Sequence, residues 1–541
     1  MGIKLGKYKV DKFYKIIPKP NVIVPKSEEF EINRETIICR GEKLKSIAQY
    51  LQDFLNKEYK LELNTSNLDE SIDKSNLIFL LVDENRDEDP EGYHLSIEKE
   101  KITVTAKTQK GVFYGIQSLI QMIYQATQES NSHKLYSAKL NCVEIHDAPR
   151  FKWRGFMLDE ARHFFGKEVV KNIFDVMASL KFNTFHWHLT DDQGWRIEIK
   201  KYPRLIEVGS KRKGTKLAKS KIFINSSVDS KETDGIPVVG FYSQEDIKEI
   251  IDYAAERYIR IIPEIDLPGH TMALLASYPE LSCTGGPFEV GTQFGIYRDV
   301  LCVGKESVFK VLEDVLREVI DLFPSKFIHI GGDEAPRTRW KKCPNCQARM
   351  VKEKIEDING LQTYFTNRIS EFLIAEGKEV VSWNETIDKF LNKEINCQYW
   401  SGSYEEVLNE LKNGRKVVIS EINFNYFNYP YRLNSLKHTY QFDPIPEGLP
   451  EEFHENILGI EACVWTELIK TKDKLEWQLF PRLIATAEIG WTQKNMRNYQ
   501  DFEHRLEILL KEFEKNGINF SIKEEYDGNH TNRAERYLRG T

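Results

Sequence analysis

The sequence predicts an α/β chain with a (β/α)8 TIM-type barrel preceded by a smaller α+β domain. Two observations predict the barrel: eight short apolar runs recur after residue 152, and amphipathic helical stretches separate most of them. A different alternation of short strands and helix before residue 147 predicts the smaller domain. The chain of 541 residues is also too long for one ordinary domain.

The first predicted domain covers residues 1–147. Strands are expected at 76–82, 93–97 and 102–105, and a helix at 111–127 because apolar side chains recur on one face of that stretch. The domain ends near Pro149, since a proline disfavours helix at the residue before it.

The predicted barrel covers residues 148–495, and a C-terminal helical extension packed on the barrel covers 496–541. Expected strands are 153–159, 184–191, 260–266, 326–333, 379–383, 396–400, 416–420 and 458–465. Expected helices are 167–180, 243–258, 305–322, 361–376, 404–412 and 477–489. A doubly wound open sheet would alternate similarly, but the count of eight strands favours a barrel.

Composition excludes several classes of function. A net charge of -7 gives no reason to expect nucleic acid or an anionic membrane as a partner. No run of 18 apolar residues occurs, and the first ten residues lack the apolar core of a signal peptide. We therefore expect a cytoplasmic protein, with a homodimer left open.

The eight cysteines are too few for a disulfide scaffold. Cys343 and Cys346 form the one CxxC motif, and a structural zinc would need two more ligands at similar spacing. No second CxxC exists, so the sequence favours no metal and no cofactor. Cys283 and Cys302 flank a glycine-rich loop, where reduced thiols are expected although oxidation could pair them.

The most informative segment is Phe327–Pro336, where an apolar run ends in two glycines followed by Asp333 and Glu334. A helix start could also attract such acids. A barrel, however, carries its chemistry at the carboxyl ends of its strands. The other expected strands end in polar and aromatic residues, namely Asp159, Arg162, His188, Asp191, Asp192, Asp266, His270, Trp383, Trp400, Tyr426, Trp465 and Glu467. Indole faces beside carboxylates and a guanidinium favour a carbohydrate site.

Several ordered motifs carry a family resemblance. They are Leu158–Phe165, His186–Arg196, Pro263–His270, His329–Glu334, Gly459–Glu467 and Phe480–Glu488. Together they resemble the signatures of family 20 glycoside hydrolases, the β-N-acetylhexosaminidases. Upstream, Ile17–Pro20, Glu91–Leu95 and Gly111–Gly115 resemble the small α/β domain that precedes the barrel in that family. The resemblance covers most of the chain.

The resemblance implies an exo-acting enzyme that removes terminal N-acetylhexosamine from an oligosaccharide or glycoconjugate. It implies substrate-assisted catalysis with retention, an exception to the usual carboxylate pair, in which the 2-acetamido oxygen attacks the anomeric carbon. Glu334 would be the acid and base, Asp333 would orient the acetamido group, and Tyr426 would donate to its oxygen. Trp383, Trp400 and Trp465 would form aromatic walls, and Arg162 and Glu467 would bind outer hydroxyls. Asp191 and His270 would support the acid, and Asp266 would lie with them behind the residues that touch the sugar.

One position departs from the family pattern. Asn428 stands where the family usually has an aspartate facing O4 and O6, so a 6-phosphorylated or 6-sulfated sugar is expected to be tolerated. Two rival functions remain, a non-catalytic carbohydrate-binding barrel and a metal-dependent hydrolase with His186, His188 and Asp191 as ligands. The first would have lost the acid or the orienting carboxylate, and activity after treatment with a strong chelator tests the second.

Overall fold

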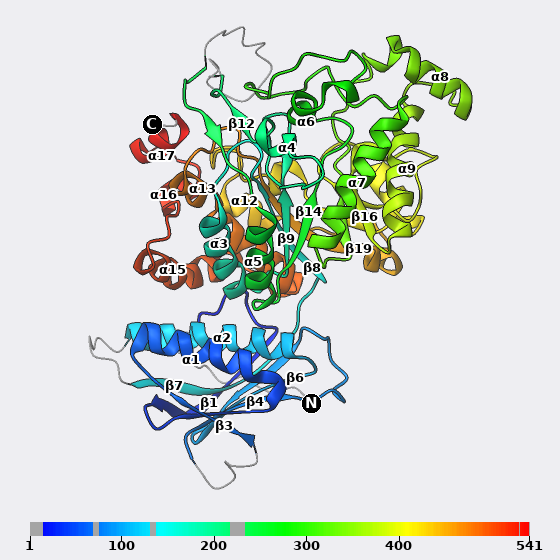
Figure 1. Cartoon of the computed structure of the whole chain (residues 1–541). Coiled ribbons are helices and arrows are strands. Elements are labelled where there is room, and N and C mark those ends of the chain that lie inside the picture. The colour runs from blue at the N-terminus through cyan, green and yellow to red at the C-terminus, as the bar shows by residue number, and fades with distance from the viewer. Residues whose placement is uncertain (1–13, 69–74, 130–136, 217–232, 530, 540–541) are drawn as a thin grey trace. The chain divides into compact units, whose positions relative to one another are not determined.

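The structure is a computed structural model that describes residues 14–68, 75–129, 137–216, 233–529 and 531–539 (Figure 1). The described chain forms two compact units. One contains residues up to 152 with 176–181 and 487–519, and the other contains 153–175, 182–486 and 520 onward. The domain boundaries predicted from the sequence stay a prediction.

The first unit contains a mixed sheet of seven described strands in the order β1-β7-β5-β6-β4-β2-β3. Its strands are β1 Val22–Asn33, β2 Ile37–Arg40, β3 Asn64–Asn67, β4 Leu77–Val82, β5 Tyr93–Ile97, β6 Lys101–Ala106 and β7 Ser137–Asp147. Helix α2 (Gln109–Glu129) packs on strands β4 to β7 and against α1 (Lys45–Tyr59), and both helices lie on one face of the sheet (Figure 1). The α+β prediction for this part is confirmed.

The second unit contains a closed barrel of eight described strands, each parallel to its neighbours. They are β8 Trp153–Asp159, β9 Thr184–His188, β14 Arg260–Glu264, β15 Phe327–His329, β16 Glu379–Trp383, β17 Asn396–Tyr399, β18 Val417–Ile419 and β19 Ile457–Val464. The predicted barrel is confirmed. Three expected strands end early: 184–191 ends at His188, 260–266 at Glu264 and 326–333 at His329. After His188 the chain leaves the barrel, because β10 (Thr190–Asp191) forms a hairpin with β11 (Gly194–Trp195).

Helices follow most barrel strands, as predicted. They are α3 Lys167–Ser179, α5 Gln244–Ala255, α7 Glu306–Leu322, α9 Gly360–Ala375, α10 Tyr404–Lys412, α13 Lys472–Leu479 and α14 Arg482–Trp491. The last two were expected as one helix over 477–489. Pro481 separates them, because proline has no N–H to donate within a helix.

Long connections extend from the carboxyl ends of β9, β14 and β15. They contain α4 Arg204–Glu207, β12 Lys211–Arg212, β13 Val238–Val239, α6 Met272–Ser277, η4 Pro279–Leu281, η5 Trp340–Lys342 and α8 Pro344–Glu353. These connections carry most of the polar residues considered below. The chain ends with α15 Tyr499–Lys515, α16 Lys523–Tyr526 and α17 Asn532–Arg539.

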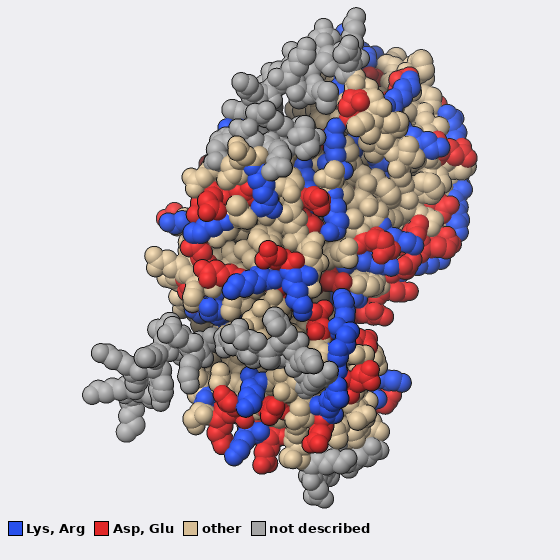
Figure 2. All heavy atoms as spheres, turned by 90° about the vertical axis from the view of Figure 1, so that its left-hand side faces the viewer, with Lys and Arg blue, Asp and Glu red and all other residues tan. Residues whose placement is uncertain are grey.

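The surface carries both signs of charge. On the face shown in Figure 2, Lys and Arg side chains are interspersed with Asp and Glu side chains. Within the described part of the chain, no helix has both the length and the apolar character needed to cross a bilayer.

Candidate active site

Asp333 and Glu334 follow β15 through a glycine turn. Gly331 and Gly332 both have positive φ, and a Cβ at Gly331 would lie 1.8 Å from Oδ1 of Asp266. The N–H of Gly332 donates to that same oxygen at 3.1 Å. Glycine is therefore required where the chain passes Asp266, and the turn brings both carboxylates to the carboxyl end of the barrel.

The two neighbouring carboxyls have different environments. The Asp333 side chain is 14% exposed and that of Glu334 is 35% exposed. Burial raises the pKa of Asp333 to about 7, although His270 acts in the opposite direction. Oδ1 of Asp333 is buried without a hydrogen-bond partner among the described residues. One carboxyl is thus held in a desolvated position with a free acceptor, and the other is open.

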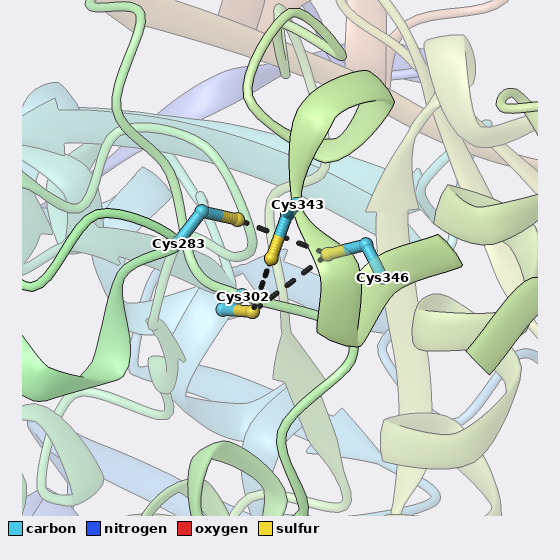
Figure 3. A group of neighbouring side chains, drawn as sticks. All are labelled: Cys283, Cys302, Cys343 and Cys346. Atoms are coloured by element: carbon cyan, nitrogen blue, oxygen red, sulfur yellow. Dashed lines mark hydrogen bonds between the residues drawn. The ribbon is translucent and has the colours of Figure 1, made fainter. Parts of the chain in front are cut away.

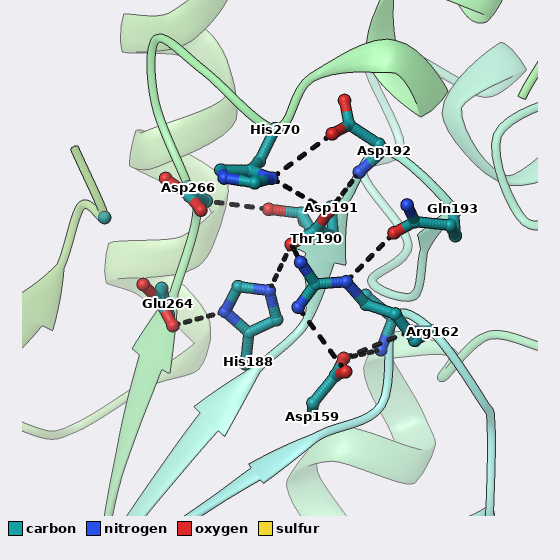
Figure 4. A network of polar contacts seen from close by, with 12 residues as sticks. Asp159, Arg162, His188, Thr190, Asp191, Asp192, Gln193, Glu264, Asp266 and His270 are labelled. Carbon is teal, nitrogen blue, oxygen red and sulfur yellow. Dashed lines mark hydrogen bonds and ion pairs between the residues drawn. The ribbon is translucent and has the colours of Figure 1, made fainter. Parts of the chain in front are cut away.

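His270 lies between these carboxyls and a second acidic pair. Its Nε2 is 3.7 Å from Oδ2 of Asp333 and 3.6 Å from Oε2 of Glu334. Its Nδ1 is 3.2 Å from a carboxylate oxygen of Asp191 and 3.2 Å from one of Asp192 (Figure 4). Burial opposes protonation, but these acids together raise the pKa of His270 well above its usual value. The imidazole is therefore cationic at neutral pH and carries one charge between two pairs of acids.

Arg162 joins the same network from the end of β8. Its guanidinium contacts Asp191 at 2.7 Å and Asp159 at 3.5 Å, and its Nε donates to Gln193 at 2.9 Å (Figure 4). Burial raises the pKa of Glu467, and Arg162 lowers it, so these two groups interact electrostatically. A buried guanidinium held by two aspartates is a rigid hydrogen-bond donor.

An aromatic cluster lies beside this network. Trp383, Tyr426 and Trp465 are buried together, and Trp400 packs on them from a less buried position. The rings of Trp400 and Tyr426 are stacked with centroids 5.9 Å apart, and the Arg162 guanidinium lies 4.9 Å from the Trp465 ring centroid. The indole N–H of Trp400 is buried without a hydrogen-bond partner in the described chain. The cluster therefore combines apolar faces with an unused donor.

Asp333 and Tyr426 link the charged network to the aromatic cluster, whereas the side chain of Asn428 makes no hydrogen bond to either of them in the described part of the chain. Asp333 is near enough to Tyr426 to raise its pKa further, although burial is the main cause. Asn428 is half-buried, and its Oδ1 has no hydrogen-bond partner within the described residues. Its backbone carbonyl accepts from Gln478 at 3.1 Å. Ten of the predicted site residues are thus linked by direct contacts or by electrostatic interactions. Asp266 lies against Gly331, and Asn428 lies on the segment that carries Tyr426.

The barrel interior contains a charged group that the sequence interpretation missed. Glu264, fully buried on β14, lies 3.1 Å from Nε2 of His186 and 2.9 Å from Nδ1 of His329, and it also contacts His188. The indole N–H of Trp383 donates to it at 2.9 Å. Burial opposes ionisation, but the histidines hold the pKa of Glu264 well below its usual range.

This arrangement bears on the metal-hydrolase alternative. Nδ1 of His188 contacts Glu264 and its Nε2 lies 2.9 Å from Asp191. Nδ1 of His186 lies 2.8 Å from Glu461. His186 thus has a carboxylate beside each ring nitrogen, Glu461 and Glu264, and one nitrogen of His188 contacts Glu264, which favours a structural role for both imidazoles.

Glu385 is a second residue that the sequence interpretation missed. It follows Trp383 by two residues in η6 (Asn384–Thr386), and its Oε2 accepts the backbone N–H of Glu334 at 2.8 Å. Glu334 has φ of +47°, a strained value for a residue with a side chain, so this hydrogen bond helps to fix its orientation. Burial raises the pKa of Glu385. An acidic residue just after a strand-end tryptophan was the available signal.

Comparisons with known proteins agree on one family. The model of the glycosyl hydrolase family 20 catalytic domain matches residues 151–494, and the model of domain 2 of that family matches residues 14–148. A β-hexosaminidase from Porphyromonas gingivalis is 37% identical over 524 residues, covering 95% of this chain and 65% of the relative. This chain therefore spans less than two thirds of that relative's length.

Solved structures show the same likeness. A family 20 exo-β-N-acetylglucosaminidase from Vibrio harveyi, in complex with N-acetylglucosamine, has a TM-score of 0.81 and 30% identity, covering 94% of this chain and 78% of that chain. A β-N-acetylhexosaminidase from Bacteroides fragilis has a TM-score of 0.79 and 30% identity, covering 95% of this chain and 99% of that chain.

Proposed function

This chain belongs to glycosyl hydrolase family 20, and from that membership we propose that it is an exo-acting β-N-acetylhexosaminidase. The substrate is an oligosaccharide or glycoconjugate with a terminal, non-reducing, β-linked GlcNAc or GalNAc. Hydrolysis proceeds with retention, and the nucleophile is the acetamido oxygen of the substrate itself.

The observation that carries this proposal is the arrangement of Asp333 and Glu334. A conventional glycosidase sets an acid and a second carboxyl on opposite sides of the scissile bond, about 5 Å apart for retention. Here the two carboxyls are neighbours in the chain and both lie beside Nε2 of His270. One is buried with a free acceptor oxygen, and the other is open. This division supports a mechanism in which only one of them exchanges protons with the leaving group and water.

In the first step, Glu334 protonates the glycosidic oxygen as the acetamido oxygen attacks the anomeric carbon. The bond to the leaving group breaks and an oxazolinium ion forms. Asp333 accepts the acetamido N–H through its unpaired oxygen and stabilises the positive charge that develops there. Tyr426 donates its hydroxyl to the acetamido oxygen.

In the second step, Glu334 takes a proton from water, and the water oxygen attacks the anomeric carbon. This attack opens the oxazolinium ring, and the anomeric configuration of the substrate is retained. General acid and base assistance of this kind contributes about 10² to 10⁴-fold in rate. His270 and the backbone contact from Glu385 position the Glu334 carboxyl, and Asp191 keeps His270 cationic.

The remaining predicted residues bind the sugar. Trp383, Trp400 and Trp465 supply apolar faces, and the free indole N–H of Trp400 is a donor for a hydroxyl. Arg162 and Glu467 provide a donor and an acceptor for the outer hydroxyls.

A panel of aryl β-glycosides tests the proposal. The panel contains GlcNAc, GalNAc, their 6-sulfates and glucose. We expect cleavage of the 2-acetamido sugars and at most trace cleavage of the glucoside, which lacks the nucleophile. Equal rates on the glucoside and the GlcNAc compound would show that the substrate-assisted mechanism is wrong.

A further inference from the structure

Four cysteines from two loops lie together beside the barrel. Cys283 and Cys302 belong to the connection after β14, and Cys343 and Cys346 belong to the connection after β15. Figure 3 shows their four sulfur atoms pointing toward one centre. The expectation that the CxxC motif lacks two further ligands is therefore wrong. The missing pair is separated by 18 residues of loop, a spacing that a search for a second CxxC does not detect.

We propose that these four thiolates bind one structural Zn²⁺ ion. Tetrahedral zinc with Zn–S bonds of about 2.3 Å requires sulfur atoms about 3.8 Å apart. The sulfur of Cys302 is 3.6 Å from that of Cys343 and 3.7 Å from that of Cys346, and the sulfur of Cys346 is 3.8 Å from that of Cys283. All four lie within 4.8 Å of one another. The edges therefore match the tetrahedron that zinc prefers.

The contacts argue against two separate thiol pairs. The Cys302 sulfur contacts two others, and so does the Cys346 sulfur, so the group is a convergent cluster. None of Cys283, Cys302, Cys343 and Cys346 is in a disulfide in the structure. Four sulfur ligands without an open position are characteristic of structural zinc rather than catalytic zinc.

The surrounding backbone is built for buried thiolates. Cys302, Cys343 and Cys346 are buried and Cys283 is half-buried. The backbone N–H of Gly304 hydrogen-bonds to the sulfur atoms of Cys302 and Cys346. Cys343 and Cys346 lie at the N-terminal end of α8, where the helix dipole also favours negative charge.

Close packing holds the two loops in this register. A Cβ at Gly304 would lie 2.1 Å from the carbonyl carbon of Asn345, so only glycine permits this approach. The indole N–H of Trp340 donates to the carbonyl of Leu301 at 2.8 Å. Nζ of Lys305 donates to the carbonyl of Ser282 at 2.7 Å, next to the first cysteine.

The site would fasten the loop that carries the active-site acids. Cys343 follows Glu334 by nine residues, and the connection after β14 carries His270 thirteen residues before Cys283. A zinc ion shared by both loops would fix their relative position without taking part in hydrolysis. The inference does not depend on the proposed function, because its tests measure metal, thiols and stability.

Metal analysis of the purified full chain is the direct test. We expect about one zinc per chain after dialysis against a weak chelator. Cys302→Ala and Cys346→Ala should lose that zinc, whereas the control Cys142→Ala, a buried cysteine on β7, should retain it. If the purified protein contains no zinc, ZnCl₂ added to it should bind at one equivalent and raise Tm by several degrees. Absence of both binding and stabilisation would overturn the proposal, as would zinc retained by the cluster variants.

Two further measurements cover variants that do not fold. Cys283→Ala removes the half-buried ligand. In the wild-type protein, Co²⁺ in place of zinc should give the intense visible absorption of a tetrahedral thiolate site. Thiol titration of the unfolded, unreduced protein in chelator should find all eight thiols. A count two or four lower would mean that one or two disulfides join the cluster, and either would contradict a zinc tetrathiolate.

Discussion

Replacement of Asp333 by asparagine isolates the contribution of one charge. Asp333→Asn keeps the size and a hydrogen-bond acceptor but removes the carboxylate, ionised above its pKa of about 7, that is proposed to face the developing oxazolinium. The Asp333 side chain is 14% exposed, so the local dielectric lies between that of water and that of a dry interior. Two unit charges about 4 Å apart at an effective dielectric of about 20 interact by about 4 kcal/mol.

Since about 1.4 kcal/mol corresponds to a factor of ten, that interaction sets an upper limit near 10³-fold on the loss of kcat. We expect a loss of about 10² to 10³-fold in kcat with KM nearly unchanged, because the partner charge appears only in the transition state.

Initial rates on an aryl β-GlcNAc glycoside, measured over a range of substrate concentrations, give kcat and KM separately. Asp252→Asn, on the exposed face of α5, is the matched control and should behave as wild type. The reasoning would be refuted by a variant that keeps kcat within about threefold of wild type, or that loses activity through KM alone.

Three further predictions concern affinity, specificity and stability. Trp400→Phe keeps the stacked ring but removes the unpaired indole N–H, so kcat/KM for the GlcNAc glycoside should fall about 3 to 10-fold. An unchanged kcat/KM would show that this N–H does not bind the sugar. Asn428→Asp should lower activity on 6-sulfated relative to neutral glycosides. An unchanged activity ratio would show that residue 428 does not determine specificity at C6. Burial and the neighbouring Arg212 lower the pKa of His163 to about 4 in the folded chain. The same imidazole has a pKa of about 6.5 in the unfolded chain, so between these two values only the unfolded chain binds a proton there. This group should therefore cost about 2 kcal/mol of stability between pH 7 and pH 5, and urea unfolding should show a smaller loss in His163→Gln.

The sequence was sufficient for the architecture because the barrel depends on periodicity. Strands such as 379–383 and helices such as 404–412 have the predicted bounds, since apolar alternation and helical spacing are local signals. The expected strand 184–191 was too long, because the side chains do not reveal where pairing passes from the barrel to the β10–β11 hairpin.

The site was predictable where residues follow strands and unpredictable where loops meet. Asp333 and Arg162 follow directly from strand ends. Glu385 was missed because its role depends on the backbone N–H of Glu334, which lies 51 residues away in the chain. The cysteine cluster was missed for a similar reason, because Cys283 and Cys343 approach each other only after two long connections have folded.

The contacts of Glu264 limit how this barrel can be altered. The Glu264 carboxylate contacts the imidazoles of His186, His188 and His329 and accepts the indole N–H of Trp383, all in the buried interior. Replacement of Glu264 would break its buried contacts with all three histidines at once, and breaking a buried ion pair typically costs about 3–5 kcal/mol. The site therefore cannot be transplanted piece by piece into another barrel. Engineering it elsewhere would require the whole interior set to be moved at once, and variation within it should arise through paired rather than single substitutions.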